Sequence, residues 1–323
     1  MFIRKAIYAF ALSLGLTAPT LAAELKLGHA LPPTSHYGVA ASAMADDLNR
    51  GTNGAWTIKQ FPASALGGER EMVEGLQLGT VDLVITSTGP VGNFVADTLI
   101  TDIPFLFKDV KHAHAVLDGP IGQRILEQFP KHNLVALAWG ENGFRNLTNS
   151  KRPVRTPEDA RGLKVRTMEN QVHMQAFRAL GMLPTPMAFP ELFTALQQGT
   201  VDGQENPIGV ILTARFPQVQ KHMTLTQHVY SPALILTSPT VWNRLSTEEK
   251  AALMRAAKVG AAAMRGKAGE DAQNGVEQLR QQGMEVVTEF DRKAFEDALK
   301  PAFVEYGKRF GQQRIDEIRN VPY

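Results

Sequence analysis

The sequence contains no cysteine, which excludes a disulfide scaffold, a thiol nucleophile and thiolate metal sites. Three common patterns are also missing, namely Gly-x-Ser-x-Gly, His-Glu-x-x-His and Gly-x-Gly-x-x-Gly. Their absence disfavours the usual hydrolase, zinc-protease and dinucleotide-binding interpretations. His112 and His114 stand two positions apart, a spacing that puts them on different faces of a helix, and no partner ligands accompany them. We therefore expect no cofactor, no metal ion and no catalytic residues.

Long apolar runs are absent as well. The longest spans residues 6–16, well short of the roughly 20 residues that a membrane-crossing helix needs. It follows Arg4 and Lys5 and precedes a stretch of small residues that ends in Ala22-Ala23, which is the order of a secretory signal peptide. The sequence predicts a leader over 1–23, cleavage near Ala22 or Ala23, and an extracytoplasmic protein without stable membrane insertion.

An excess of positive charge is also missing once the leader is removed. Loss of Arg4 and Lys5 lowers the number of basic residues from 34 to 32, which equals the 32 acidic residues. A neutral chain without a long run of Lys or Arg gives no electrostatic reason to expect nucleic acid or an anionic membrane surface as a partner.

What the sequence does contain is alternation of strand-like and helical segments. Strand patterns at 24–30, 56–61 and 81–85 enclose helical patterns at 35–49 and 69–78. This β-α-β-α-β order predicts an α/β lobe, and about 300 mature residues are enough for two such lobes.

A near repeat supports a second lobe of similar build. Leu-Gln-Leu-Gly-Thr-Val-Asp over 76–82 returns as Leu-Gln-Gln-Gly-Thr-Val-Asp over 196–202. In both copies a helix is expected to end at the glycine, and a strand to follow. The loops at 87–90 and 205–207 then fall at carboxyl ends of strands, where open α/β sheets bind ligands.

A capping box at 246–249 begins a helical stretch that runs to about Gln282 and is long enough to span both lobes. Three glycines inside it, Gly260, Gly266 and Gly269, are plausible bend points. We expect the first lobe to comprise 24–143 plus about 232–271. The second is expected to comprise 144–231 plus about 272–323.

Candidate ligand-binding residues are two arginines and an asparagine. Arg166 ends the strand Leu163-Lys-Val-Arg, so its guanidinium is expected to reach into the cleft and hold a carboxylate bidentately; a structural salt bridge to Glu169 or Asp202 is the alternative. Arg145 is a second cation near the lobe crossover, or an exposed surface arginine. Asn206 precedes Pro207 and is interpreted as a helix N-cap that favours an anion.

These residues also carry a family resemblance. Segments Gly143-Phe-Arg145, Gly162 to Arg166, Phe189-Pro-Glu-Leu-Phe and Gly199 to Pro207 occur in this order and spacing. The chain thus resembles the substrate-binding subunit of a TRAP transporter, the DctP-like family, over essentially its whole mature length. The resemblance implies an α/β periplasmic binding protein fold with two lobes, each a sheet flanked by helices, a ligand cleft between them and a long helix spanning both.

The same resemblance implies capture of a small organic carboxylate in the periplasm and its delivery to the small and large TRAP membrane subunits. It assigns Arg166 to the ligand carboxylate, Arg145 to a second charged contact, Asn206 to a hydrogen bond and Phe189 to packing on the ligand. Sialic-acid-binding members resemble one another in having an acidic residue at the position where this chain has Ser87.

Ser87, with His36 nearby, favours a shorter acid that carries hydroxyl or keto oxygens. The expected classes are hydroxy, keto and sugar acids. Glu169 either accepts hydrogen bonds from ligand hydroxyls or orients Arg166. Two other functions stay open, an exported enzyme that uses Glu169 or Glu205 with a histidine and a periplasmic sensor. We expect a monomer, and the sequence does not identify the acid.

Overall fold

The computed structural model describes residues 22–323. Its strands are β1 (Ala23–His29), β2 (Trp56–Phe61), β3 (Leu83–Ser87), β4 (Val135–Asn149), β5 (Lys164–Thr167), β6 (Leu183–Pro186), β7 (Gly203–Pro207), β8 (His222–Thr237) and β9 (Glu285–Val287). Its α-helices are α1 (His36–Gly51), α2 (Glu69–Leu78), α3 (Thr88–Val91), α4 (Val110–Asp118), α5 (Pro120–Leu126), α6 (Pro157–Ala160), α7 (Gln171–Ala179), α8 (Phe189–Gln197), α9 (Ile208–Thr213), α10 (Pro239–Arg244), α11 (Thr247–Gln281), α12 (Arg292–Ala298), α13 (Lys300–Tyr306) and α14 (Gln312–Arg319). Shorter turns are η1 (Ala96–Asp102), η2 (Phe129–His132), η3 (Phe216–Gln218) and η4 (Gly307–Gly311).

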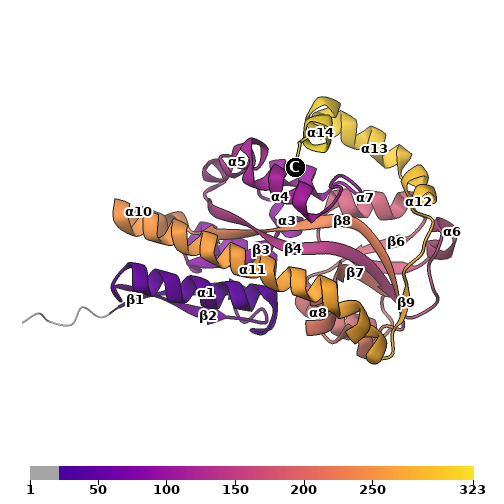
Figure 1. Ribbon diagram of the computed structural model, residues 1–323, viewed down its shortest axis with the longest axis horizontal. Helices are drawn as coiled ribbons and strands as arrows, with labels where there is room; N and C mark the ends of the chain where they lie inside the picture. The colour runs from indigo at the N-terminus through magenta and orange to yellow at the C-terminus, as the bar shows by residue number, and fades with distance from the viewer. Residues whose placement is uncertain (1–21) are drawn as a thin grey trace, which may run out of the picture.

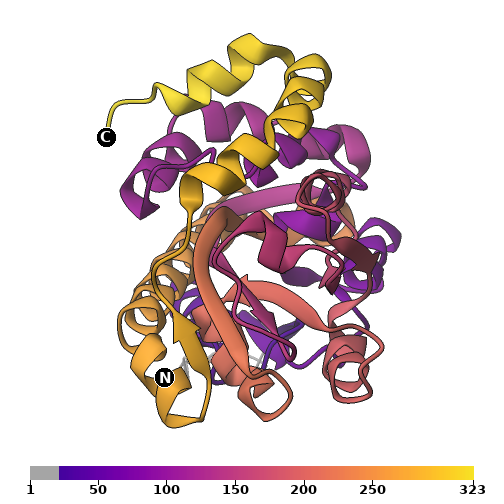
Figure 2. The same cartoon turned by 90° about the vertical axis from the view of Figure 1, so that its right-hand side faces the viewer.

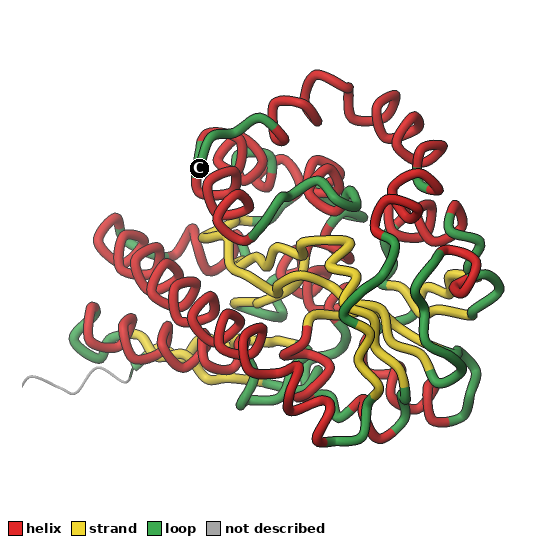
Figure 3. The backbone as a smooth tube through the Cα atoms, turned by 45° about the vertical axis from the view of Figure 1, so that its right-hand side comes forward, coloured by secondary structure: helices red, strands yellow, loops and turns green. Residues whose placement is uncertain are grey.

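One hydrogen-bonded sheet runs through the part of the chain that the structure describes, in the order β2-β1-β3-β8-β4-β7-β5-β6, with β9 beside β8. Strand β1 pairs in parallel with β2 and β3, and β5 pairs in parallel with β6 and β7. These two parallel groups are the sheets of the two lobes, with helices around both (Figure 1, Figure 3). The predicted α/β fold with two lobes is confirmed, and β4 and β8 make the two sheets continuous.

The long strands β4 and β8 pair antiparallel, and their register shifts three times. One shift lies between Glu141 and Gly143, where Gly143 has a φ of 109°, a left-handed conformation that glycine adopts without a Cβ penalty. Strand β4 thus bends at this bulge, between the two lobes.

The near repeat builds the same local structure twice. Helix α2 is followed by Gly79 with φ 73°, and α8 is followed two residues on by Gly199 with φ 71°. The aspartate of each copy then accepts a backbone N–H from the neighbouring parallel strand: Asp82 from Lys26 at 2.8 Å, and Asp202 from Lys164 at 2.9 Å. The motif therefore fixes how each helix–strand unit joins its sheet.

Helix α11 is unbroken over 35 residues and crosses the molecule beside both lobes (Figure 1). The helix is not interrupted at any of the three expected bend points. A Cβ on Gly266 or Gly269 would meet nothing within 4 Å, whereas Gly260 and also Gly275 serve packing. A Cβ on Gly260 would lie 2.4 Å from Cγ of Met44 in α1, and one on Gly275 would lie 2.2 Å from Cγ2 of Ile208 in α9. Close approach to α1 in one lobe and to α9 in the other makes α11 a brace between them.

The helices at the carboxyl end return to the first lobe, where they lie above α4 and α5 (Figure 2). Arg124 pairs with Glu317, and Arg314 pairs with Asp97 at 3.1 Å. Buried residues of α13 and α14 share a hydrophobic core with η1, α4 and α5. The chain beyond 300 thus contacts a lobe other than the one to which the sequence assigned it, and the division by residue ranges stays a prediction.

No helix of residues 22–323 is both long and apolar enough to span a membrane. The predicted leader lies outside the described residues, except that Ala23 begins β1.

Candidate functional site

A small cavity of about 20 Å³ lies where the carboxyl ends of β3, β5 and β7 meet. Both lobes contribute to its wall. The lining residues are Ala30, Leu31, Tyr37, Glu69, Ser87, Asn142, Arg166, Met168, Phe189, Asn206 and Val210. The repeat predicted ligand-binding segments at 87–90 and 205–207, and one residue of each, Ser87 and Asn206, lines this cavity. The cavity is the candidate ligand site.

Arg166 supplies the positive charge of this cavity. Its side chain is 2% exposed, and its Nε and Nη2 donate to the carbonyl oxygen of Met187 at 2.9 and 2.7 Å. Among residues 22–323, no carboxylate oxygen lies within 4.0 Å of its guanidinium nitrogens. The alternative of a salt bridge to Glu169 or Asp202 is therefore wrong. Burial lowers the pKa of Arg166 to about 10, so the group is a cation at neutral pH.

Phe189 supports this arginine from α8. Its ring centroid lies 5.9 Å from Cζ of Arg166, within the range of a cation–π contact, and its other neighbour is Phe216 at 6.2 Å between centroids. One edge of the guanidinium is thus held by a backbone carbonyl and its face by a ring. Nη1 takes no part in the hydrogen bonds to Met187, and Arg166 lines the cavity.

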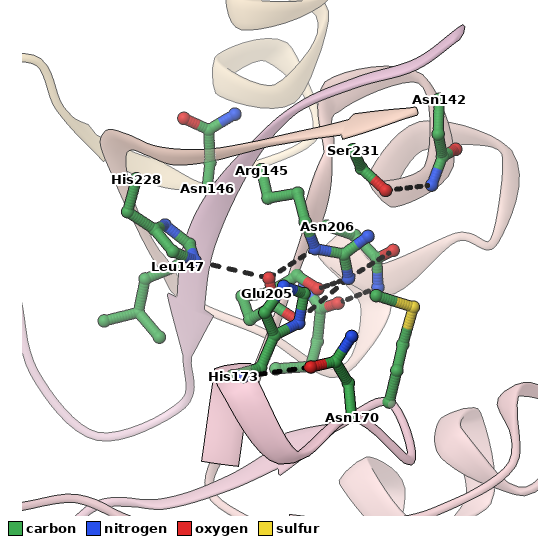
Figure 4. A network of polar contacts seen from close by, with 12 residues as sticks. Asn142, Arg145, Asn146, Leu147, Asn170, His173, Glu205, Asn206, His228 and Ser231 are labelled. Atoms are coloured by element: carbon green, nitrogen blue, oxygen red, sulfur yellow. Dashed lines mark hydrogen bonds and ion pairs between the residues drawn. The ribbon is translucent and has the colours of Figure 1, made fainter. Parts of the chain in front are cut away.

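Arg145 occupies a different environment from the one that the sequence indicated. It is fully buried and pairs with Glu205, whose Oε1 accepts from Nη2 at 2.8 Å and whose Oε2 accepts from Nε at 2.5 Å. Figure 4 shows His228 on the far side of the same carboxylate, with Nε2 3.3 Å from Oε2. Burial acts to raise the pKa of Glu205, but Arg145 and His228 outweigh it and hold that pKa below its ordinary value.

The exposed-surface alternative for Arg145 is therefore wrong. The side chain does not line the cavity, and Nη1 has no hydrogen-bond partner in the described structure. Arg145 reaches the cavity wall through Asn206, whose Oδ1 accepts from Nη2 at 3.1 Å.

Asn206 lies in the cavity wall, but not as a helix cap. It belongs to β7, and Pro207 is the N-cap of α9, which has six residues. The interpretation as an N-cap was wrong because the chain stays extended up to Pro207. Its amide donates to Oε1 of Gln204 at 2.5 Å, so Gln204 and Arg145 together fix its orientation.

Glu69 is a cavity residue that sequence reasoning missed. Its Oε1 accepts from the hydroxyl of Thr86 at 2.9 Å and from the N–H and hydroxyl of Ser87 at 2.8 and 3.0 Å. All three donors contact the same oxygen, which leaves Oε2 as an acceptor. The available signal was the Gly67-Gly68 break, which starts α2 at Glu69 and aims its first residue at the end of β3.

Three further polar side chains stand behind or within the opposite wall. Tyr37 is 2% exposed, and its buried hydroxyl has no hydrogen-bond partner in residues 22–323. Oδ1 of Asn142 accepts a hydrogen bond from Nε2 of His36 at 2.9 Å, and Nδ2 of Asn142 donates to Oγ of Ser231 at 3.4 Å. The structure thus places His36 behind Asn142, one layer from the cavity, and places Tyr37 in the wall itself.

Glu169 lies outside the cavity. It lines a second pocket of about 250 Å³ nearer the surface, and its carboxylate is 3.7 Å from Nη1 of Arg70 in the first lobe. It makes no ion pair with Arg166. Neither expected role, contact with ligand hydroxyls or orientation of Arg166, follows from this position, and its contact with a ligand stays a prediction.

The histidines near the cavity give a first prediction, on pH. Burial lowers the pKa of His36 to about 4, and burial together with the charge of His36 lowers the pKa of His29 to about 4. An unfolded chain takes up protons on these rings near pH 6.5, so their contribution to stability is present above that pH and is lost as pH falls toward 4.

For His36 this loss is on the order of 3 kcal/mol. Urea titrations at pH 7 and 4.5 should show a smaller loss of unfolding free energy for His36→Gln than for the wild type, since glutamine does not titrate. Parallel pH curves for the two proteins would contradict the assignment.

Comparisons with known proteins agree on one family. The model of the DctP family, bacterial extracellular solute-binding protein family 7, matches residues 27–309. A TRAP periplasmic solute-binding protein of Polaromonas sp. JS666, solved with D-erythronate, is 54% identical, with a TM-score of 0.92 over 93% of this chain and 99% of the other. A Bordetella TRAP periplasmic solute-binding protein, with density assigned to pantoate, is 54% identical with a TM-score of 0.91 over 93% and 99%. The 2,3-diketo-L-gulonate-binding periplasmic protein YiaO of Escherichia coli K12 is 38% identical over 93% of this chain and 92% of the relative.

Proposed function

Because the chain belongs to the DctP family of bacterial extracellular solute-binding proteins, whose solved members are TRAP periplasmic solute-binding proteins, we propose that it captures a small hydroxy carboxylic acid and delivers it to TRAP membrane subunits. The observation that carries the proposal is Arg166, a buried cation in the cavity wall without a protein carboxylate beside it. A ligand carboxylate supplies the missing partner.

Arg166 provides a planar fork of donors that suits a carboxylate better than a lysine could. Burying a cation without a partner costs several kcal/mol, so closure of the lobes around an empty site is disfavoured. An anion bound to Arg166 removes this cost in the closed form only. The ligand therefore binds the closed form more tightly than the open form and shifts the population toward the closed form, as a capture mechanism requires.

Glu69 sets the polarity of the rest of the ligand. An ionised carboxylate accepts hydrogen bonds from hydroxyl groups and repels a second carboxylate. Ser87 and Thr86 occupy one of its oxygens, and the other is available to a ligand. This arrangement favours a monocarboxylic hydroxy acid over a dicarboxylic acid, and the bound D-erythronate of the Polaromonas relative is an acid of that kind.

The corresponding prediction compares two acids of equal chain length. By calorimetry, the protein should bind erythronate at least about a hundredfold more tightly than succinate, because the far carboxylate of succinate meets Glu69. Glu69→Gln keeps the shape and removes the charge, so it should bring the two dissociation constants together. Equal binding of both acids by the wild type would contradict the role of Glu69.

A catalytic function is separated from capture by the fate of the acid. Glu205 is held by Arg145 and His228 away from the cavity, so it has no access to a bound molecule as an acid or base. Mass spectrometry of erythronate after prolonged incubation is expected to return it intact. New species in that spectrum would favour an exported enzyme.

The proposed site comprises Arg166, Asn206, Phe189, Ser87, Glu69 and Tyr37 as lining residues, with Arg145 and His36 acting through Asn206 and Asn142. We place the protein in the periplasm, as the family description and the predicted leader indicate, with the TRAP membrane subunits as its partners.

A further inference from the structure

Met168 of the second lobe closes on the first lobe at one end of the cavity. It follows β5, is 4% exposed, and its Sδ lies 3.3 Å from Oγ of Ser87. Gly89, in α3 of the first lobe, receives it: a Cβ on that glycine would lie 2.5 Å from both Sδ and Cε of Met168. Gly89 does not have a positive φ, so space for Met168, not backbone geometry, accounts for the glycine.

The same side chain separates two pockets. The inner cavity of about 20 Å³ and the outer pocket of about 250 Å³ share four lining residues, Glu69, Arg166, Met168 and Phe189. Arg166 and Phe189 form the anchor, and Glu69 is fixed by its three donors. Met168 is the one apolar, unbranched side chain of the four that touches the opposite lobe. Met168 is therefore the side chain between the two pockets that can be shortened without changing the anchor or Glu69.

On the basis of the proposed function, we infer that Met168 limits the length of the acid and makes the protein selective for chains of about four carbons. The limit acts when the lobes close, because the contact of Met168 with Ser87 and Gly89 joins the two lobes. Pro90, Glu169 and Glu191 line the outer pocket beyond it, which offers polar groups to any chain that passes.

The spacing of Arg166 and Met168 makes ligand length the relevant variable. The two residues are two positions apart, so their Cα atoms are about 6.6 Å apart in an extended chain. Two more carbons lengthen an extended acid by about 2.5 Å. An acid of six carbons anchored at Arg166 therefore extends further toward Met168 than an acid of four carbons.

The test compares erythronate, with four carbons, and galactonate, with six, by calorimetry on the full protein. The wild type should bind erythronate at least about a hundredfold more tightly. Met168→Ala opens the partition, so the preference should fall to about tenfold or less, mainly through tighter binding of galactonate. Met168→Leu is the matched control, because it conserves the volume and should keep the preference.

Circular dichroism of both variants checks that they fold. If Met168→Ala does not fold, Met168→Leu alone tests the inference. Loss of the preference for erythronate in Met168→Leu would overturn it. An unchanged ratio of dissociation constants in Met168→Ala would also overturn it, as would equal binding of the two acids by the wild type. If the wild type binds neither erythronate nor galactonate, the proposed function fails and takes this inference with it. Tight binding of either acid shows that a failure concerns Met168 alone.

Discussion

Replacing Arg166 by alanine is expected to weaken binding of the hydroxy acid by about a hundredfold or more. The substitution removes the cation that faces the cavity and leaves the ligand carboxylate in a buried wall without a charged partner. It also frees the carbonyl of Met187, which accepts two of the guanidinium hydrogen bonds. Calorimetry with erythronate measures the effect, and wild-type affinity in the variant would remove Arg166 from the central role.

Arg166→Lys is the informative companion of this variant. Lysine keeps the charge but not the planar fork, and it cannot donate to Met187 and to a carboxylate in two parallel pairs. It should recover little of the lost affinity. Recovery to within a few-fold of the wild type would mean that charge alone, without bidentate geometry, accounts for the anchor.

Replacing Glu205 by alanine is expected to lower the free energy of unfolding by about 3–5 kcal/mol, because it leaves Arg145 as an uncompensated buried charge. Both side chains of this pair are 0% exposed. Glu205→Gln keeps the shape and should also be strongly destabilising. Urea unfolding followed by circular dichroism measures both variants.

The matched control removes a glutamate from an exposed pair. Glu317 contacts Arg124 with about half of each side chain exposed, and pairs of this kind contribute at most about 1 kcal/mol. Glu317→Ala should therefore stay close to the wild type. If the Glu205 and Glu317 variants lose the same free energy of unfolding, burial of the ion pair between Arg145 and Glu205 does not increase its contribution to stability.

What the sequence could predict was local. The left-handed glycines Gly79 and Gly199 after two helices, the α/β order and the position of Arg166 near a strand end follow from patterns a few residues long, and the structure confirms them. The near repeat and the family resemblance both predicted two lobes. Neither the short patterns nor the resemblance depends on knowing which distant segments of the chain are in contact.

The remainder depended on contacts between distant residues. Arg145 and Glu205 are 60 positions apart, so their pairing could not be recognised from either segment, and Arg145 was expected to meet the ligand directly. Gly260 of α11 was expected to be a bend point because its packing against α1 is invisible in the sequence. Glu69 was missed for the same reason, since its role depends on the end of β3.

The shared strands β4 and β8 also determine how the cleft can open mechanically. Because both strands run from one lobe into the other, the lobes cannot slide past each other or separate without breaking a ladder of backbone hydrogen bonds. The register shifts interrupt that ladder at three positions, where a bulged strand bends and twists more than a regular one. Any opening of the cleft therefore has to bend these two shared strands.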